Sequence, residues 1–281
     1  MKVVVTRQEL REARAGFSAL AFVPTMGYLH EGHLSLVRQA KADCGAVAAS
    51  IFVNPLQFGP TEDLATYPRD LARDLAALEA VGCDLVWTPE VADVYPPGFA
   101  TFVDVEGVTD VLEGARRPGH FRGVATVVNI LFNAVTPTKA YFGQKDAQQT
   151  VVLRKMVRDL GMPLELVIAP TVREPDGLAM SSRNSYLEPD QRAAATVLIR
   201  SLRAAQEAWS TGQQDAEALR RAMREVLAAE PLADVDYVSV ADPTTLAELD
   251  QVDPAIGALA SLAVRVGRPR LIDNMILAPR T

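Results

Sequence analysis

The sequence is poor in the residues that build disulfide frameworks and zinc sites. Cys44 and Cys83 are its only cysteines, and it contains three histidines. Neither cysteine has a second Cys or His at metal-ligand spacing, and two cysteines give no disulfide framework. We therefore expect two buried free thiols, no zinc site and a reducing, cytoplasmic environment.

Long apolar runs are also missing. No apolar stretch reaches the roughly 20 residues that a membrane-spanning helix requires, and the N-terminus lacks the apolar core of a signal peptide. The net charge of −7 argues against nucleic acid or an anionic membrane as the main partner. A local group of backbone N–H donors, Lys and Arg can still bind an anionic ligand in an acidic protein.

What is present is an ordinary globular composition, with 49% hydrophobic and 22% charged residues over 281 positions. Over residues 1–175, short apolar runs alternate with helical patterns. This alternation predicts a Rossmann-like parallel sheet with helices on both faces and a ligand at the carboxyl ends of its strands. The expected strands are Val3–Val5, Leu20–Val23, Gly45–Val53, Asp84–Trp87, Lys139–Phe142 and Leu164–Ile168. The expected helices are Arg7–Ala15, His33–Ala42, Arg69–Val81, Gly123–Val135 and Ala147–Leu160.

From about residue 175 the pattern changes. We expect residues 176–281 to form a smaller C-terminal α/β domain that acts as a lid. The loop Arg173–Arg183 carries Pro, Gly and Ser and is the candidate hinge. The elements expected here are the helices Asp190–Ser210 and Asp215–Ala229 and the strands Val235–Ala241, Ser261–Val266 and Arg270–Leu277.

The segment Pro24–His33 lies between an expected strand and an expected helix. Its glycines allow close approach of the backbone to a ligand, and the helix N-terminus offers N–H groups to phosphate. Two of the three histidines, His30 and His33, fall here and could donate hydrogen bonds to developing phosphate charge. The alternative is a simple turn whose histidines cap the helix. An H-x-G-H segment in this context favours the nucleotide-binding interpretation.

Two further segments suit a polyphosphate. Phe142–Asp146 again lies between a strand and a helix, and Lys145 supplies a point charge. Met180–Asn184, in the expected hinge, supplies two hydroxyls and a guanidinium for a mobile clamp. A surface turn and a helix cap are the respective alternatives. We expect the two strand-end turns and the loop to converge on one triphosphate.

Other polar residues are candidates for binding a small acid. Gln57 follows the carboxyl end of an expected strand, where a neutral amide could orient a hydroxy acid. Gln148 and Gln149 begin the helix after Phe142–Asp146. For each, an exposed polar residue is the alternative. Arg117 lies in a basic turn and either meets a carboxylate or phosphate or belongs to an ordinary loop.

Together these segments resemble the pantothenate synthetases, or pantoate–β-alanine ligases. The resemblance covers nearly the whole chain in order. More broadly, the H-x-G-H segment and the Met180–Arg183 loop resemble the paired signatures of the nucleotidyltransferase and class I aminoacyl-tRNA synthetase superfamily. The motifs that carry the resemblance are Pro24–His33, Phe52–Phe58, Tyr67–Arg69, Arg117–Phe121, Gly143–Asp146, Met180–Asn184 and Leu271–Asn274.

The resemblance implies a two-step reaction. ATP and pantoate give pantoyl-adenylate and pyrophosphate, and β-alanine then attacks to give pantothenate and AMP. It further implies Mg²⁺ as a cofactor and a cytoplasmic homodimer. His33 would be the principal catalytic residue, assisted by His30 and Lys145. The nucleotide-binding residues would be Met26, Gly27, Tyr28, Leu29, His30, Glu31, Gly32, His33, Gly143, Gln144, Lys145, Asp146, Val172, Met180, Ser181, Ser182 and Arg183.

The resemblance also implies residues for the other ligands. Asp74 matches an acidic position near the metal and phosphates. Two positions depart from the family pattern: Tyr28 replaces a small residue, and Ala77 replaces a polar residue three positions after the acidic one, which weakens the case for metal ligation from this helix. The substrate-binding residues would be Gln57, Gln149 and Arg117.

Two other functions are compatible with parts of the sequence. A plain nucleotidyltransferase that makes a dinucleotide or a CDP-type product would share the phosphate segments, but the Gln57 and Arg117 turns argue against it. If the protein were a non-catalytic nucleotide-binding module, we would expect the phosphate-site residues to be lost. His33, Lys145 and Arg183 are all present, which argues against this function.

Overall fold

The computed structural model describes residues 1–60 and 62–280 and divides into two compact units. The N-terminal unit comprises Met1–Gly143 and Val152–Pro170, and the C-terminal unit comprises Gln144–Val151 and Thr171–Thr281. The units thus interleave along the chain, and a single domain boundary after residue 175 stays a prediction. Within the described residues, none of the helices combines the length and apolar character that crossing a membrane requires.

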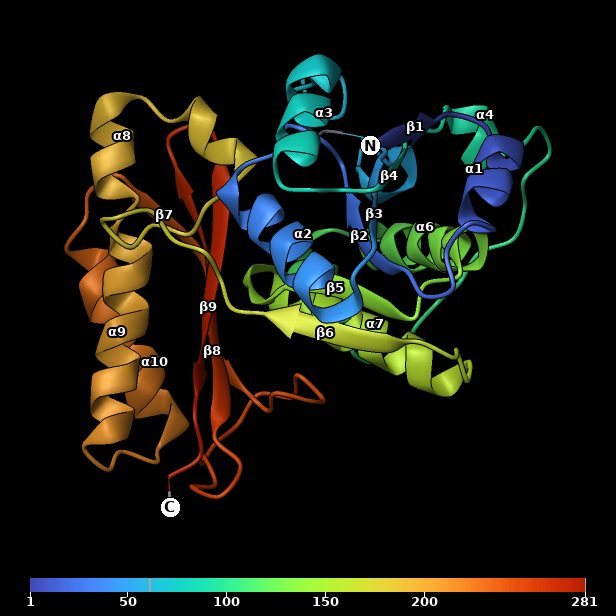
Figure 1. The fold of residues 1–281 in the computed structure, drawn as a ribbon. Helices are drawn as coiled ribbons and strands as arrows, with labels where there is room; N and C mark the ends of the chain where they lie inside the picture. The colour runs from blue at the N-terminus through green and yellow to red at the C-terminus, as the bar shows by residue number, and fades with distance from the viewer. Residues whose placement is uncertain (61, 281) are drawn as a thin grey trace. The chain divides into compact units, whose positions relative to one another are not determined.

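The N-terminal unit is built on a six-stranded, fully parallel sheet in the order β1-β4-β3-β2-β5-β6 (Figure 1). Its strands are β1 (Lys2–Val4), β2 (Ala21–Thr25), β3 (Val47–Ile51), β4 (Leu85–Trp87), β5 (Lys139–Gly143) and β6 (Glu165–Ala169). Its helices are α1 (Arg7–Arg14), α2 (Glu31–Cys44), α3 (Leu71–Ala80), α4 (Val91–Val94), α5 (Leu112–Arg116) and α6 (His120–Val135), with a 3₁₀ turn η1 (Pro55–Gln57). A second 3₁₀ turn, η2 (Gln144–Asp146), and the helix α7 (Ala147–Asp159) follow β5.

Helices cover both faces of this sheet, as predicted. On one face, Val37 of α2 and Leu78 of α3 pack against buried strand residues such as Val86. On the other, Phe132 of α6 meets Phe142 of β5, with ring centroids 6.3 Å apart. Strands covered on both faces are apolar along their whole length, which explains why they read as continuous apolar runs. The Rossmann-like α/β sheet expected from the sequence is confirmed.

The sheet topology marks one edge as the place for a ligand. From β2 the chain continues to β3 on one side, whereas β5, the neighbour of β2 on the other side, comes after β4. In open α/β sheets ligands bind outside the carboxyl ends of strands at such a reversal point. The residues that end β2, β3 and β5 there are Thr25, Ile51 and Gly143.

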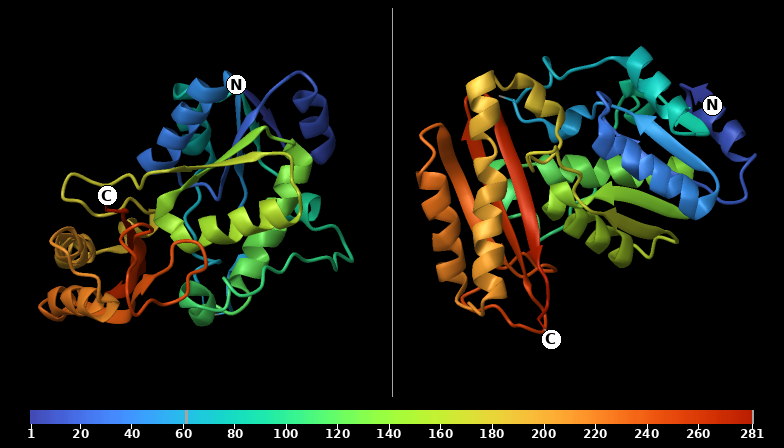
Figure 2. Two further views of the ribbon diagram at one scale, coloured as in Figure 1. Left: turned by 90° about the horizontal axis from the view of Figure 1, so that it is seen from below. Right: turned by 60° about the vertical axis from the view of Figure 1, so that its left-hand side comes forward.

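The C-terminal unit is built on a three-stranded antiparallel sheet in the order β7-β8-β9. The strands are β7 (Ala233–Ala241), β8 (Ala258–Val266) and β9 (Arg270–Leu277), and the helical segments are η3 (Ser182–Tyr186), α8 (Pro189–Ala194), α9 (Val197–Ser210) and α10 (Ala216–Ala228). The long helices α9 and α10 lie side by side along one face of this sheet (Figure 2).

Several predicted bounds in this region were wrong in detail; the strand expected from Val235, for example, begins at Ala233. The single helix expected over Asp190–Ser210 is two helices, separated at Ala195 and Thr196. Thr196 directs its hydroxyl to the carbonyl of Ala193 rather than capping the next helix. The strand expected from Ser261 begins at Ala258, because three more residues pair with β9 and are buried.

The cysteines are both free thiols. Cys83 is buried as predicted, and burial raises its pKa to about 11. The prediction of burial was wrong for Cys44, which is partly exposed. It is the last residue of α2, immediately before the left-handed cap residue Gly45, so the helix end leaves it beside solvent.

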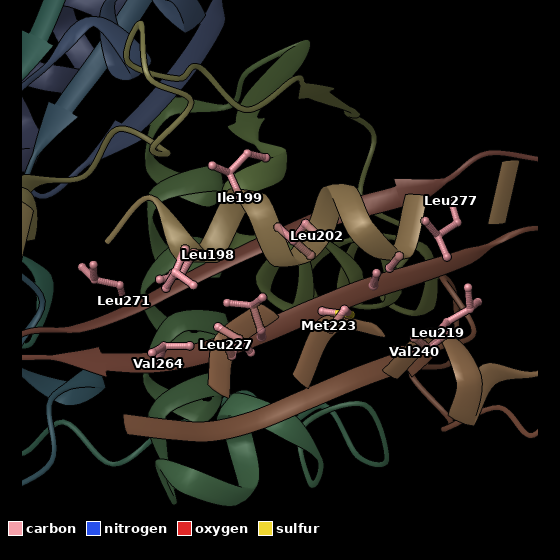
Figure 3. Close-up of a cluster of buried hydrophobic side chains, with 14 of the residues drawn as sticks. Leu198, Ile199, Leu202, Leu219, Met223, Leu227, Val240, Val264, Leu271 and Leu277 are labelled. Atoms are coloured by element: carbon pink, nitrogen blue, oxygen red, sulfur yellow. The ribbon is translucent and has the colours of Figure 1, made fainter. Parts of the chain in front are cut away.

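The core of the C-terminal unit lies between its sheet and its two long helices. Leu198 and Leu202 of α9 and Met223 of α10 point into it, and β8 and β9 contribute Val264 and Leu271 (Figure 3). Burial of an apolar side chain of this size contributes about 1.5–3 kcal/mol relative to exposure. This packing makes the unit a stable frame for the loops it carries.

Replacement of Leu202 tests this core. Leu202 is 0% exposed, and Leu202→Ala should lower the free energy of unfolding by about 2–5 kcal/mol because it leaves a cavity. The measurement is the urea unfolding transition. Leu232→Ala is the matched control, because Leu232 is 42% exposed. Equal losses in the two variants would contradict the proposed packing.

Candidate active site

The turn after β2 has an uncommon backbone conformation that depends on a buried carboxylate. Gly27 has φ 82° and Tyr28 has φ 49°. The Oδ2 atom of Asp74 accepts the N–H of Tyr28 at 2.6 Å, and Oδ1 accepts that of Leu29 at 2.7 Å. A Cβ atom on Gly27 would lie 3.0 Å from Asp74 and 3.1 Å from Ile51. Glycine is therefore required there for both its φ angle and its lack of a side chain.

The two histidines of the H-x-G-H segment cap helix α2. The Nδ1 atom of His30 accepts the N–H of Gly32 at 3.2 Å, and the Nδ1 atom of His33 accepts the N–H of His30 at 3.3 Å. Their ring centroids are 4.1 Å apart. Since Nδ1 accepts in both rings, the neutral tautomers carry their protons on Nε2. The capping alternative is thus realised, and it also fixes which nitrogen of each ring can donate.

Helix α2 begins two residues earlier than the sequence indicates. It starts at Glu31 with His30 as its N-cap, whereas the prediction placed its start near His33. As a consequence, Glu31, Gly32 and His33 form the first helical turn, in which His30 accepts the N–H groups of Gly32 through its ring and of His33 through its carbonyl. Such a turn directly follows β2 at the reversal point of the sheet, which is a favourable place for an anionic group.

Asp74 is placed as an anchor of the turn. Its side chain is 1% exposed, and both its oxygens accept backbone N–H groups. Among residues 1–60 and 62–280, no group of three or more His, Cys, Asp or Glu residues could hold a metal ion. Direct metal ligation by Asp74 stays a prediction that this geometry does not support.

The unusual Tyr28 is accommodated by a neighbour of Asp74. The guanidinium of Arg73 lies 4.8 Å from the centroid of the Tyr28 ring and donates to the carbonyl of Leu29 at 2.9 Å. Helix α3 therefore holds the turn through two consecutive residues. The structure gives no specific role to Ala77.

Gln57 is held beside the first segment by a set of side-chain hydrogen bonds. Its Nε2 atom lies 3.3 Å from the sulfur of Met26, and its Oε1 atom accepts from Asn54 at 3.0 Å. Asn54 also donates to the carbonyl of Gly123 and accepts from the hydroxyl of Tyr95 at 2.6 Å. Burial raises the pKa of Tyr95 well above its usual range, so this hydroxyl remains a donor.

Asn54 and Tyr95 are residues that the sequence analysis missed. Asn54 is 1% exposed and caps η1. Its signal was available, since an Asn-Pro pair directly after a strand is typical of a turn. The contribution of Tyr95 comes from a segment 41 residues away and had no local signal.

Arg117 belongs to a compact charged cluster. Its guanidinium pairs with both oxygens of Glu62 at 2.6 and 2.7 Å, and its Nη1 atom lies 3.0 Å from Nε2 of His120. The Nδ1 atom of His120 lies 2.8 Å from the carbonyl of Gln57. Because arginine only donates, Nε2 of His120 accepts and Nδ1–H donates to Gln57. Direct substrate binding by Arg117 stays a prediction, since its fork is engaged in supporting the Gln57 turn.

The charges of this cluster follow from its geometry. Burial lowers the pKa of His120 to about 4, and the adjacent Arg117 cation contributes to the same shift. For Glu62, burial acts to raise the pKa, but the hydrogen bond and charge of Arg117 prevail and hold it below its ordinary value. At neutral pH the cluster is therefore a neutral imidazole beside an ion pair.

The remaining predicted residues lie in the C-terminal unit, apart from Gly143. Met180 donates its N–H to the carbonyl of Val172 at 3.0 Å, and Ser181 caps η3 by accepting the N–H of Arg183. In η2, the Nζ atom of Lys145 lies 3.6 Å from Oδ1 of Asp146. Gln148 is buried and Gln149 is half-buried in the first turn of α7. Convergence of these residues with those of the N-terminal unit stays a prediction.

Comparison with known proteins identifies the family of this chain. A family model described as pantoate-beta-alanine ligase matches residues 2–276. The chain belongs to the pantoate–β-alanine ligase family. This match spans both units and every segment described above, so the resemblance stated from the motifs is confirmed.

Individual members of the family support the assignment. The chain is 67% identical over 277 residues to a pantothenate synthetase of Herpetosiphon aurantiacus, covering 99% of this chain and 100% of the relative. A crystal structure of pantothenate synthetase from Thermus thermophilus is 52% identical, with a TM-score of 0.95 and coverage of 99% and 100%. A pantoate–β-alanine ligase structure from Francisella tularensis is 31% identical, with a TM-score of 0.81 over 100% of both chains.

Gly123 tests the support of the Gln57 turn. A Cβ atom at Gly123 would lie 2.3 Å from the carbonyl oxygen of Leu56, so Gly123→Ala must displace η1 from α6. We expect kcat/KM to fall by at least about tenfold, because a shift of about 1 Å in a positioned group can cost about 10²-fold. Gly16→Ala is the control, because its Cβ would meet only Ala13 at 3.4 Å. Equal activity of the two variants would contradict this role.

The lowered pKa of His120 predicts a pH dependence of stability. In the unfolded chain His120 takes up a proton below about pH 6.5, whereas in the folded chain it does so only near pH 4. The unfolded state therefore binds more protons in this interval, and stability falls as the pH drops through it. Glu62 contributes only below its ordinary value of 4.5.

The measurement is the urea midpoint between about pH 4.5 and 6.5, above the range of Glu62 and up to the ordinary pKa of histidine. The His120→Asn variant keeps an amide donor where Nδ1 lies but cannot titrate. It should lose part of the decline that the unaltered protein shows on acidification. Parallel curves for the two proteins would exclude His120 as the group responsible.

Proposed function

We propose that the chain condenses pantoate with β-alanine in two steps at the carboxyl edge of the six-stranded sheet. ATP first activates pantoate as pantoyl-adenylate and releases pyrophosphate. The amine of β-alanine then displaces AMP to give pantothenate. The overall ligation follows from membership of the family, and the route through the adenylate is the proposal.

One observation carries the proposal more than any other. At the ends of neighbouring strands β2 and β3, the amide of Gln57 lies against Met26, the residue that opens the H-x-G-H turn. An acid-orienting amide thus adjoins a turn suited to a phosphate. The relative from Francisella tularensis was solved as a complex with "Beta-gamma ATP" and β-alanine, which supports ATP and β-alanine as ligands here.

For the nucleotide, we propose three segments of the chain. They are Met26–His33, Gly143–Asp146 and the pair formed by Val172 and Met180–Arg183. Attack of a carboxylate on the α-phosphate needs alignment and charge stabilisation more than a strong base. The Nε2–H groups of His33 and His30 and the Lys145 ammonium are suited to stabilising that charge.

For the acids, we propose that Gln57 contacts both pantoate and β-alanine and that Gln149 contacts pantoate. Arg117 would act through the Gln57 turn, since its donors already bind Glu62 and adjoin His120. A closing movement of the C-terminal part of the chain as a lid would exclude water from the mixed anhydride.

We propose that Mg²⁺ binds together with ATP. The described residues do not by themselves form a carboxylate site for it, because Asp74 uses both oxygens on backbone N–H groups. Mg²⁺ in nucleotide sites is held largely by substrate phosphates and water. We therefore derive no catalytic step from a metal bound to the protein alone.

The cellular setting is proposed from the family resemblance. We propose a cytoplasmic enzyme that associates as a homodimer. The net charge of −7 supports small-molecule partners rather than nucleic acid or an anionic membrane.

Product analysis tests the function directly. With ATP and pantoate present and the enzyme at catalytic concentration, AMP should be released only when β-alanine is also supplied. A plain nucleotidyltransferase would release pyrophosphate and no AMP. His33→Ala should lower kcat by a factor of about 10²–10³, the range typical for loss of one charge-stabilising donor. Turnover without AMP release would contradict the proposed function. Unchanged turnover of His33→Ala would show that His33 takes no part in the mechanism.

A further inference from the structure

Two polar residues are buried in the middle of the edge strand β9. Asp273 is 2% exposed and Asn274 is 4% exposed. They end the Leu271–Asn274 motif, which the family resemblance includes but to which the function above gives no role. A buried carboxylate or amide is costly unless it is hydrogen-bonded. The partners of these two side chains therefore indicate what the motif does.

Asn274 is bonded to the turn that carries Lys145. Its Nδ2 atom donates to the carbonyl of Gln144 at 2.9 Å and to that of Lys145 at 2.8 Å. Its Oδ1 atom accepts from the side-chain amide of Gln144 at 3.1 Å. Exchanging the oxygen and nitrogen of this amide would set an acceptor against two carbonyls, so the network itself fixes the orientation. Every one of these bonds is made to η2.

Asp273 is bonded to the start of the Arg173–Arg183 loop. Its two oxygens pair with the guanidinium of Arg173 at 2.6 and 3.0 Å. Arg173 also donates to the carbonyls of Gly177 at 3.1 Å and Asn274 at 3.3 Å. A bidentate Arg–carboxylate pair gives geometric specificity as well as energy. The ion pair thus holds the base of the loop against the same strand position that holds η2.

The loop is in turn braced up to the polyphosphate segment. Arg173 and Ala179 form an isolated antiparallel bridge, and Asn184 donates to the carbonyl of Ala179 at 3.0 Å and to Glu174 at 3.2 Å. Met180–Arg183 lies between these two fixed points. All of these residues belong to the C-terminal unit.

We propose that Asp273 and Asn274 are positioning residues for adenylate formation. Asn274 sets the backbone of Lys145, Asp273 sets the loop Met180–Arg183 through Arg173, and adjacency on one strand keeps the two groups in register. The inference rests on the proposed nucleotide-binding role of these segments. It goes further, because it assigns the pair to the ATP-dependent half of the reaction rather than to the fold alone.

The decisive variant is Asn274→Asp, which keeps the size of the side chain but removes both donors and sets a carboxylate oxygen against two carbonyls. Adenylate formation is read as pantoate-dependent exchange of labelled pyrophosphate into ATP. We expect the exchange rate to fall at least about tenfold and KM for ATP to rise. KM for β-alanine should stay unchanged, because Gln57 belongs to the other unit.

The matched control is Ser261→Ala. Ser261 is the register partner of Asn274 on β8, is 5% exposed, and its hydroxyl has no hydrogen-bond partner among the described residues. Its variant perturbs the same place in the sheet without touching η2, and should keep the unaltered exchange rate. Far-UV circular dichroism at the assay temperature verifies that each protein is folded.

A second pair of variants decides the matter if Asn274→Asp does not fold. Arg173→Lys keeps the charge but loses the two-pronged pairing with Asp273, and should slow exchange several-fold. Asp236→Asn is its control, because it removes a different ion pair, with Arg270, at the start of the same strand. Only the first should slow exchange.

The outcomes separate the two proposals. Folded Asn274→Asp or Arg173→Lys enzyme with unaltered exchange rate and KM for ATP would overturn the positioning role, whatever its stability. Slowed exchange with unaltered KM for β-alanine would support that role. An unaltered enzyme that forms no AMP from ATP, pantoate and β-alanine would instead refute the proposed function itself.

Discussion

The candidate site depends on a backbone turn that the chain adopts only because a distant carboxylate stabilises it. Two consecutive residues after β2 have positive φ angles, and the second, Tyr28, is not a glycine. An L-residue in that region costs about 1–2 kcal/mol. Asp74 offsets this by accepting two backbone N–H groups. The direction in which the chain leaves β2, and therefore the start of α2, follows from this contact.

Much of the fold could be predicted, because the relevant signals are local. Buried parallel strands read as apolar runs, and glycines mark the turns that follow them. The break between α8 and α9 could not be predicted in this way. Ala195 and Thr196 both keep right-handed helical φ and ψ angles, and no Pro or Gly signals the interruption.

The candidate site was predictable to the extent that its residues lie at strand ends. The H-x-G-H turn, Gln57 and Lys145 were found for that reason. The roles of Asp74, Arg117 and Asn54 were not, because their partners lie 46, 55 and 41 residues away in the chain. A charged residue in a turn looks the same in the sequence whether it binds a ligand or supports its neighbours.

The interleaving of the two units has a consequence for how the protein is made. Residues 144–151 complete the C-terminal unit but leave the ribosome well before Thr171, where the rest of that unit begins. During synthesis the carbonyls of Gln144 and Lys145 therefore lack their bonds to Asn274 until β9 has been made. No single cleavage of the chain yields two intact halves. A truncated gene product that stops before β9 would retain all six strands of the parallel sheet and a turn whose backbone has lost its bonds to Asn274.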